Sequence, residues 1–227
     1  MTPQFDIATA RFNMIEQQIR PWDVLDQDVL DLLDVVRREA FVPALHRRLA
    51  FSDLEIPLHQ VGGAGAVGCA MWAPKLEARV LQEVGPKAHD RALEIGTGSG
   101  YFAALLAHRC RLVTSVEIVP GLKTFAERNL RAAGVANVRL IDGDGAQGYG
   151  RDLYDIIVLS GSTPVLPPSL LAQLNPGGRL FAVVGDAPAM SARLVSKGAD
   201  GAIAGITLFE TVLAPLTKAA QPVRFRV

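Results

Sequence analysis

The chain of 227 residues is poor in several features, and each scarcity excludes a class of protein. Its two cysteines, Cys69 and Cys110, are too few for a disulfide framework and lack metal-ligand spacing. Its 23 basic and 23 acidic residues balance, so no charged surface for nucleic acid or anionic membrane is expected. No apolar run approaches membrane length, and the N-terminus lacks the apolar core of a signal peptide. We expect a cytoplasmic protein without metal, nucleic-acid or membrane partners.

Size and hydrophobicity set the domain organisation. Hydrophobic side chains make up 49% of the residues, enough for one compact domain with an extension. We expect residues 1–60 to form a helical N-terminal extension and residues 61–227 the main domain.

The extension shows helical patterning. Phe12, Ile15 and Ile19 fall on one face of an expected helix, and Asp26 is a suitable cap for a second helix. Arg38 follows this second helix and is interpreted as a solvated charge at its end.

A glycine-rich turn is the most informative stretch. Residues 91–95 predict a buried strand, glycines follow at alternate positions, and residues 101–110 predict a helix. Such a turn lets a ligand approach bare backbone at a helix N-terminus, which a Cβ would block. The spacing is G-x-G-x-G, not the dinucleotide pattern G-x-G-x-x-G. With Glu94 before it, the turn resembles motif I of S-adenosyl-L-methionine (SAM)-dependent methyltransferases; the alternative is a plain strand-to-helix connection.

Two further acids follow strands at spacings that suit a nucleoside. Residues 111–117 predict a strand that ends in Glu117, 21 positions after Gly96, where a carboxylate accepts hydrogen bonds from both ribose hydroxyls. Residues 138–141 predict another strand, and Asp144 after it suits recognition of the adenine amino group. The alternatives are a capping or surface role for Glu117 and an ordinary Asp-Gly turn at Asp144.

Strands and helices alternate through the rest of the chain. This alternation predicts an α/β fold with a doubly wound, mostly parallel sheet, whose late strands lie antiparallel at the edge. The loops after neighbouring parallel strands are expected to converge. The expected later elements are a strand at 154–159 with Ser160 after it, a helix at 169–174, a turn at 175–178, a strand at 179–185 and a strand-like piece at 202–212.

The stretch before the first core strand is rich in glycine. Residues 61–73 end in two large apolar side chains, Met71 and Trp72, and Pro74 then opens a helix. We interpret the stretch as a mobile lid over the cofactor. The alternative is a flexible linker.

Several motifs together resemble the protein-L-isoaspartate (D-aspartate) O-methyltransferase family, nearly from end to end. They are Met14-Ile-Glu-Gln-Gln-Ile19, Arg38-Glu-Ala-Phe-Val-Pro43, Phe51-Ser-Asp-Leu-Glu-Ile-Pro-Leu58, Leu93-Glu-Ile-Gly-Thr-Gly-Ser-Gly-Tyr101, Gly143-Asp-Gly145 and Leu174-Asn-Pro-Gly-Gly-Arg179. The resemblance implies a Rossmann-like methyltransferase fold, SAM as cofactor and S-adenosyl-L-homocysteine as product. It also implies methyl transfer to the abnormal α-carboxylate of isoaspartyl residues in damaged proteins.

The motifs and the resemblance together assign a cofactor site. Its expected residues are Glu94, Ile95, Gly96, Thr97, Gly98, Gly100, Tyr101, Glu117, Ile118, Asp144, Gly145 and Ser160. No catalytic residue is assigned, because a carboxylate is already ionised at neutral pH and attacks a methyl group without a base. The barrier is lowered mainly by positioning.

One loop departs from the family pattern. The family carries Thr-Ile-Ser and, one residue later, Pro; here the segment is Ala70-Met-Trp72, with Trp72 in the place of the serine. The lost hydroxyl is a lost hydrogen bond, not a lost base. Met71 and Trp72 are therefore candidate substrate contacts, with Trp72 stacking on a planar acceptor or closing the pocket. The alternative is that Trp72 packs under the loop.

Three functions follow from these observations. The first is isoaspartyl methyl transfer to a protein or peptide, the second is methyl transfer to a different, aromatic or small-molecule acceptor, and the third is non-catalytic SAM binding. The three acids Glu94, Glu117 and Asp144 favour cofactor binding in each case. The oligomeric state stays open.

Overall fold

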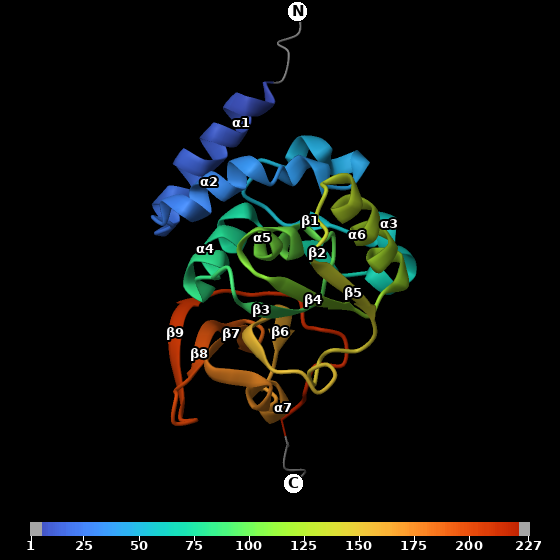
Figure 1. Cartoon of the computed structure of the whole chain (residues 1–227). Coiled ribbons are helices and arrows are strands. Elements are labelled where there is room, and N and C mark those ends of the chain that lie inside the picture. Colours follow the sequence, from blue (N-terminus) through green and yellow to red (C-terminus); the bar gives the residue numbers. More distant parts are fainter. Residues whose placement is uncertain (1–5, 223–227) are drawn as a thin grey trace, which may run out of the picture.

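A computed structural model describes residues 6–222 of the chain. The described residues build a central sheet with the strand order β5-β4-β3-β6-β7-β8-β9 (Figure 1). Its strands are β3 (Arg91–Ile95), β4 (Leu112–Glu117), β5 (Val138–Asp142), β6 (Tyr154–Thr163), β7 (Leu174–Asp186), β8 (Ala189–Lys197) and β9 (Ile203–Glu210). A small separate sheet pairs β1 (Ile56–Pro57) with β2 (Ala70–Met71).

The connection pattern creates a switch point in the sheet. From β3 the chain runs outward through β4 to β5, and it then returns to place β6 on the other side of β3. The strands from β5 to β7 are parallel, whereas β8 and β9 are antiparallel at the edge. The predicted doubly wound, mostly parallel sheet is confirmed. Ligands of such sheets bind at the carboxyl ends of the strands beside the switch point.

Helices cover the two faces of the sheet unequally. The face at the top of Figure 1 carries α4 (Pro74–Val84), α5 (Tyr101–Arg109) and α6 (Pro120–Ala132), and the N-terminal elements lie over them. The opposite face carries the short α7 (Pro168–Ala172). The remaining helices are α1 (Ile7–Met14), α2 (Gln27–Val35) and α3 (His59–Gly62), with a π-helical turn at Ile15–Ile19 and 3₁₀ turns at Arg20–Trp22, Arg38–Ala40, Ala44–Leu49 and Gly63–Ala66.

Helix α4 shows how the sequence sets an element. Pro74 occupies its first turn, where the missing N–H costs nothing, and Gly85 ends it with φ +46°. Its buried side chains recur at helical spacing and enter the core beneath the N-terminal extension; they include Leu76, Val80, Leu81 and Val84.

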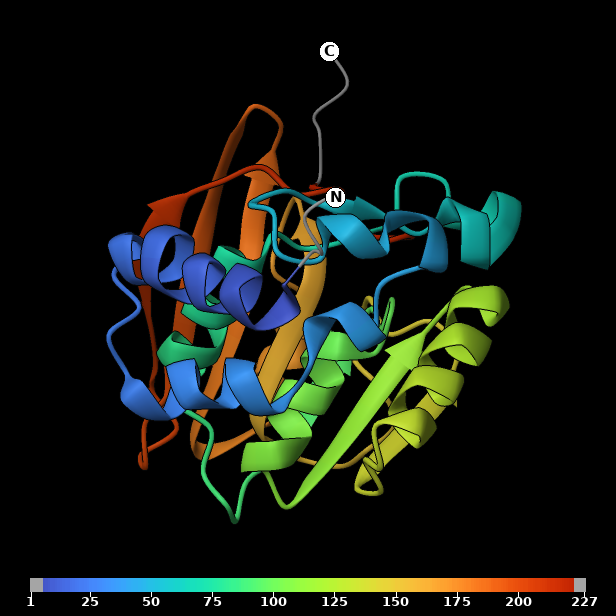
Figure 2. The same cartoon turned by 90° about the horizontal axis from the view of Figure 1, so that it is seen from above.

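The N-terminal helices lie across the same hydrophobic core (Figure 2). The division of the chain at residue 60 stays a prediction. The predicted apolar face of the first helix is wrong in part, because 63% of Phe12 is exposed whereas Ile19 is buried. The π-helical turn after Met14 changes the number of residues per turn, so regular helical spacing does not carry Phe12 onto the face of Ile19.

Residues 61–73, interpreted as a mobile lid, hold the end of α3, a 3₁₀ turn and β2, and the lid stays a prediction. Two other segments differ from the sequence prediction. The turn predicted at 175–178 lies inside β7, where Gly177 takes φ +79°. Strand β8 was not predicted, because its burial pattern is irregular and its partners are formed only in the folded sheet.

No helix within residues 6–222 is long and apolar enough to cross a membrane. The same residues contain no cluster of three or more His, Cys, Asp or Glu side chains that could hold a metal ion.

The buried ring of Phe181 on β7 provides a test of this core. Phe181→Ala is expected to lower the free energy of unfolding by about 3–5 kcal/mol, because a fully buried ring leaves a cavity. Urea denaturation measures the change. The matched control Phe12→Ala removes an exposed ring and is expected to change stability by about 0.5 kcal/mol or less. Equal losses in the two variants would contradict the placement of these rings.

Candidate functional site

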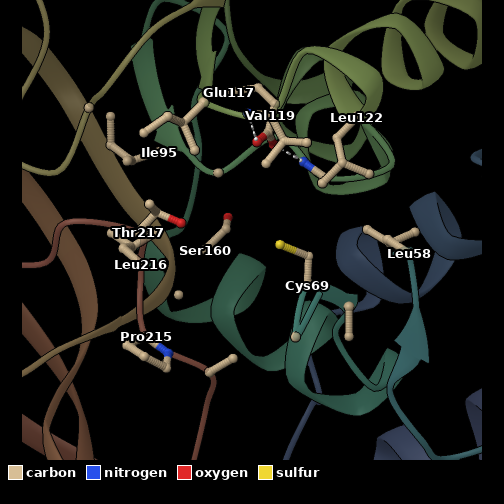
Figure 3. A pocket seen from close by; sticks show the side chains of 18 of the residues that line it. Leu58, Cys69, Ile95, Glu117, Val119, Leu122, Ser160, Pro215, Leu216 and Thr217 are labelled. Carbon is tan, nitrogen blue, oxygen red and sulfur yellow. Dashed lines mark hydrogen bonds between the residues drawn. The ribbon is translucent and has the colours of Figure 1, made fainter. Parts of the chain in front are cut away.

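A cavity of about 240 Å³ opens at the carboxyl ends of β3, β4 and β6, beside the switch point. Figure 3 shows its walls, with Glu117 and Val119 on one side and the segment around Pro215 on another. The side chains of Cys69 and Ser160 point into the space between them. Burial and the nearby Glu117 raise the pKa of Cys69, so its thiol stays protonated at neutral pH.

The glycine turn after β3 forms the floor of the cavity. Gly96 and Gly98 take φ +96° and +55°, conformations that favour glycine. The turn is held by Glu117 at the end of β4, whose carboxylate accepts hydrogen bonds from the N–H of Gly98 at 2.8 Å and of Val119 at 2.9 Å. One carboxylate thus joins the turn to the start of α6.

Glu94 lies beneath the turn and is completely buried. Ser115 Oγ donates to its Oε2 at 2.5 Å, and Ser160 Oγ donates to its Oε1 at 3.4 Å. Burial raises the pKa of Glu94 to about 8, and the neighbouring Glu117 adds to this rise. Burial likewise raises the pKa of Glu117. Because Coulomb attraction opposes such shifts, a positive ligand charge in the cavity would stabilise both carboxylates in their ionised form.

The loop after β5 supplies the third acid. Asp144 Oδ1 accepts from the N–H of Ala146 at 3.0 Å, and Lys218 Nζ lies 3.6 Å from Oδ2. Beside it, a Cβ on Gly145 would lie 2.6 Å from Ile95 Cδ1. A larger residue at position 145 would therefore force the Ile95 side chain to shift.

The sequence analysis missed one wall of the cavity, the segment 213–217. It returns from the sheet edge and pairs with β6, since Ser162 N–H donates to Ala214 O at 2.9 Å and Leu216 N–H donates to Ser162 O at 2.9 Å. Leu216 lies against Gly161, where a Cβ would be 2.9 Å from it. No local motif marks this segment, because its position depends on pairing with a strand some 50 residues earlier.

The structure brings most of the predicted site residues to the cavity but not all. The cavity is lined by Ile95, Gly96, Gly98, Glu117, Ile118, Asp144, Gly145, Ser160 and Trp72. Glu94, Thr97 and Met71 line a small adjoining recess. Gly100 and Tyr101 line neither space: Gly100 packs against α6, and the Tyr101 ring is buried 5.4 Å from the Phe41 ring. Their assignment to the cofactor stays a prediction.

Trp72 both lines the cavity and packs in the core, and its contact with an acceptor stays a prediction. It lines the cavity and the recess, but only 6% of it is exposed, and its ring lies 5.6 Å from the Phe102 ring and 6.2 Å from the Phe181 ring. The interpretation of Arg38 as a solvated charge is wrong, since only 1% of Arg38 is exposed. Its guanidinium donates to Trp72 O at 2.7 Å, a contact that local sequence does not reveal.

The residues present fit a cationic nucleoside cofactor. The glycine turn leaves bare backbone at the floor, two buried carboxyls that pair with no cation among residues 6–222 flank it, and Asp144 lies just after the next strand. Together with the mostly parallel sheet, this arrangement is the one expected of a SAM-dependent methyltransferase of the Rossmann-like class.

Comparisons with known proteins identify the family. A model of the protein-L-isoaspartate(D-aspartate) O-methyltransferase (PCMT) family matches residues 10–221. A protein-L-isoaspartate O-methyltransferase of Methanoculleus marisnigri is 40% identical over 176 residues, 77% of each chain. One from Methanospirillum hungatei is 36% identical over 193 residues, 85% of this chain and 86% of that protein. The chain therefore belongs to the protein-L-isoaspartate (D-aspartate) O-methyltransferase family, which confirms the resemblance.

Solved structures agree on the fold. The structure of a PCMT from Plasmodium falciparum in complex with S-adenosyl-L-homocysteine superposes with a TM-score of 0.76 at 20% identity, covering 91% of this chain and 97% of that chain. A second structure, described as protein-L-isoaspartate O-methyltransferase, also gives 0.76, at 26% identity over 90% of this chain and 65% of its own.

The raised pKa of Glu94 predicts a pH dependence of stability. The folded protein holds this proton up to about pH 8, whereas the unfolded chain releases it near the ordinary value of 4.5. The stability contributed by the neutral form is therefore present below pH 4.5 and is lost as the pH rises through 8. Glu94→Gln cannot titrate, so its free energy of unfolding should fall less steeply between pH 5 and 8, by up to about 1.4 kcal/mol per pH unit.

Urea denaturation of both proteins at pH 5, 6, 7 and 8 measures the two slopes. Glu77, whose pKa burial raises to about 7, titrates in both proteins. Its repulsion of the Glu94 carboxylate is a smaller cause of the raised pKa of Glu94 and is absent from Glu94→Gln. Parallel pH profiles would contradict the raised pKa of Glu94.

Proposed function

We propose that this chain transfers a methyl group from SAM to the free α-carboxylate of isoaspartyl residues in damaged proteins. The observation that carries the proposal is the glycine turn held by Glu117 at the floor of a cavity beside the switch point, in a chain of this family. An acceptor carboxylate would reach the donor in this cavity, and the buried acids there suit a cationic donor.

The chain's own residues would bind and orient the cofactor. When bound, SAM supplies a methyl group activated by a positively charged sulfur. Each Glu117 oxygen already accepts one backbone N–H, and a carboxylate has about four acceptor sites, so ribose hydroxyls can still donate to it. Asp144 would accept from the adenine amino group. Glu94, buried beneath the turn, would balance the positive charge of the methionine portion.

The acceptor needs orientation more than activation. Its carboxylate is ionised near neutral pH, so no side chain has to remove a proton. Aligning two reactants can supply about 7–11 kcal/mol of the barrier. Trp72 and Leu216, both on the cavity wall, would exclude water from the reacting atoms.

Trp72 also favours a second candidate, methyl transfer to another acceptor on the same scaffold. It places an indole where the family has a serine, and it is held between Phe102 and Phe181. An aromatic or small-molecule acceptor could stack where an isoaspartyl peptide would need a hydroxyl donor.

We further propose a cytoplasmic location and a protein or peptide as the partner. Both cysteines are free thiols, which suits a reducing compartment. Because basic and acidic residues balance, we propose no nucleic-acid partner.

Methyl transfer to paired peptides tests the first proposal. With labelled SAM, an isoaspartyl peptide is expected to be methylated, and its normal aspartyl twin is not, because the acceptor is the displaced α-carboxylate. Calorimetric titration with S-adenosyl-L-homocysteine shows in parallel that the cofactor site is intact. Cofactor binding without methylation of either peptide would shift the conclusion to another acceptor or to non-catalytic binding, and absence of both would refute all three functions.

Replacement of Trp72 tests what the indole does to the acceptor. Trp72→Ser is expected to raise kcat/KM for the isoaspartyl peptide about tenfold, since one regained hydrogen bond contributes about 1.4 kcal/mol. It is also expected to lower the free energy of unfolding by about 3–5 kcal/mol, because a core ring is lost.

Trp72→Ala is the matched control, because it opens the same space without a hydroxyl. If kcat/KM rises in both variants, the removal of the bulky indole explains the effect. If it rises only in Trp72→Ser, the regained hydrogen bond explains it. If neither variant exceeds the parent enzyme, the indole does not obstruct the isoaspartyl peptide.

A further inference from the structure

Arg38 is a charged side chain buried at the edge of the candidate site, with 1% of it exposed. It comes from the 3₁₀ turn Arg38–Ala40 of the N-terminal extension. Its Nε donates to Ala50 O at 3.0 Å and its Nη2 donates to Trp72 O at 2.7 Å, while Nη1 donates to Glu77 Oε2. The guanidinium carbon lies 5.3 Å from the centre of the Tyr101 ring.

Glu77 faces this guanidinium from the first turn of α4. It too is buried, and burial raises its pKa to about 7 although Arg38 lowers it. Desolvation of two charges is costly, and a buried ion pair often stabilises a fold no better than hydrophobic side chains of similar volume. Stability of the fold alone therefore does not explain why this ion pair lies here.

The contacts of Arg38 show what the pair can do. Ala70, in β2, and Trp72, directly after it, line the cavity. Pairing of β2 with β1 holds this backbone on one side, and the N–H groups of Leu76 and Glu77 hold the carbonyl of Ala73 on the other. Between them, the bond from Arg38 to Trp72 O joins the N-terminal extension to the cavity wall, whatever side chain stands at position 72.

We propose that Arg38 and Glu77 are positioning residues for methyl transfer, which hold the acceptor loop, residues 70–73, against the cavity. Glu77 orients the guanidinium, and the guanidinium fixes the loop through the carbonyl of Trp72. Neither residue touches the reacting atoms. The activity readout rests on the proposed function, but the position of the loop can be measured without it.

The test compares two arginines in similar surroundings. Arg179 on β7 also pairs with a buried acid, Asp90, at 2.8 Å, and it also donates to backbone carbonyls, those of Val84, Gly85 and Asp155. Its contacts lie at the opposite ends of the strands, away from the cavity. Lysine keeps the charge but lacks the fork that reaches several acceptors, so Arg38→Lys and Arg179→Lys are matched variants.

For activity, Arg38→Lys is expected to raise KM for the isoaspartyl peptide at least tenfold, with the Kd of S-adenosyl-L-homocysteine changed less than twofold. Arg179→Lys is expected to change neither by more than twofold. Arg38→Met/Glu77→Leu, which replaces the pair by hydrophobic side chains, is expected to show the same rise in KM. Unchanged KM in both folded Arg38 variants, or an equal rise in Arg179→Lys, would overturn the proposal.

A second readout does not depend on the acceptor. The chain has two tryptophans, so a Trp22→Phe background isolates the fluorescence of Trp72. Arg38→Lys in that background is expected to raise the acrylamide quenching constant at least twofold, because a released loop exposes the indole, and Arg179→Lys is not. Unchanged quenching in Arg38→Lys would refute the positioning role. If the parent enzyme methylates no isoaspartyl peptide, the proposed function fails while quenching still decides this inference.

Discussion

The hold of the Glu117 carboxylate on the glycine turn is the contact on which the site depends. It accepts the N–H of Gly98 and of Val119, and so connects the turn after β3 with the loop that opens α6. Left without this acceptor, the half-buried Gly98 N–H would lose its partner within the protein, at a cost of about 1 kcal/mol. The backbone of the turn adds a second constraint. Gly96 and Gly98 have positive φ values, which residues with a Cβ atom rarely adopt.

The acids of the site explain its preference for a positive ligand. Among residues 6–222, Glu77 has Arg38 as its ion-pair partner, whereas Glu94 and Glu117 have none. Burial without a cation raises the pKa of both, so the free protein carries carboxyls whose ionised form is poorly stabilised. The asymmetry favours a ligand that brings its own positive charge. The same acids that suit such a ligand therefore cost the free protein stability at neutral pH.

Local sequence was sufficient for the part of the site made by adjacent residues. A strand, glycines and an acid within ten positions predict the turn at Gly96, and one strand further on Glu117 follows at a fixed spacing. It was insufficient where the partners are distant. The burial of Arg38 depends on carbonyls of Ala50 and Trp72, 12 and 34 positions away, and the wall at 213–217 depends on Ser162. A charged side chain followed by a turn looks solvated until such acceptors are in place.

In the acceptor loop, the backbone and the side chain of residue 72 are held in different ways. The backbone at position 72 is fixed by Arg38, while its side chain departs from the family pattern. Because a carboxylate acceptor needs no base, loss of the loop hydroxyl removes one hydrogen bond, about 1.4 kcal/mol or a tenfold change in rate. Alignment of the reactants supplies several times more, about 7–11 kcal/mol. A substitution at position 72 can therefore retune the acceptor without abolishing the chemistry, provided that the loop backbone stays in place.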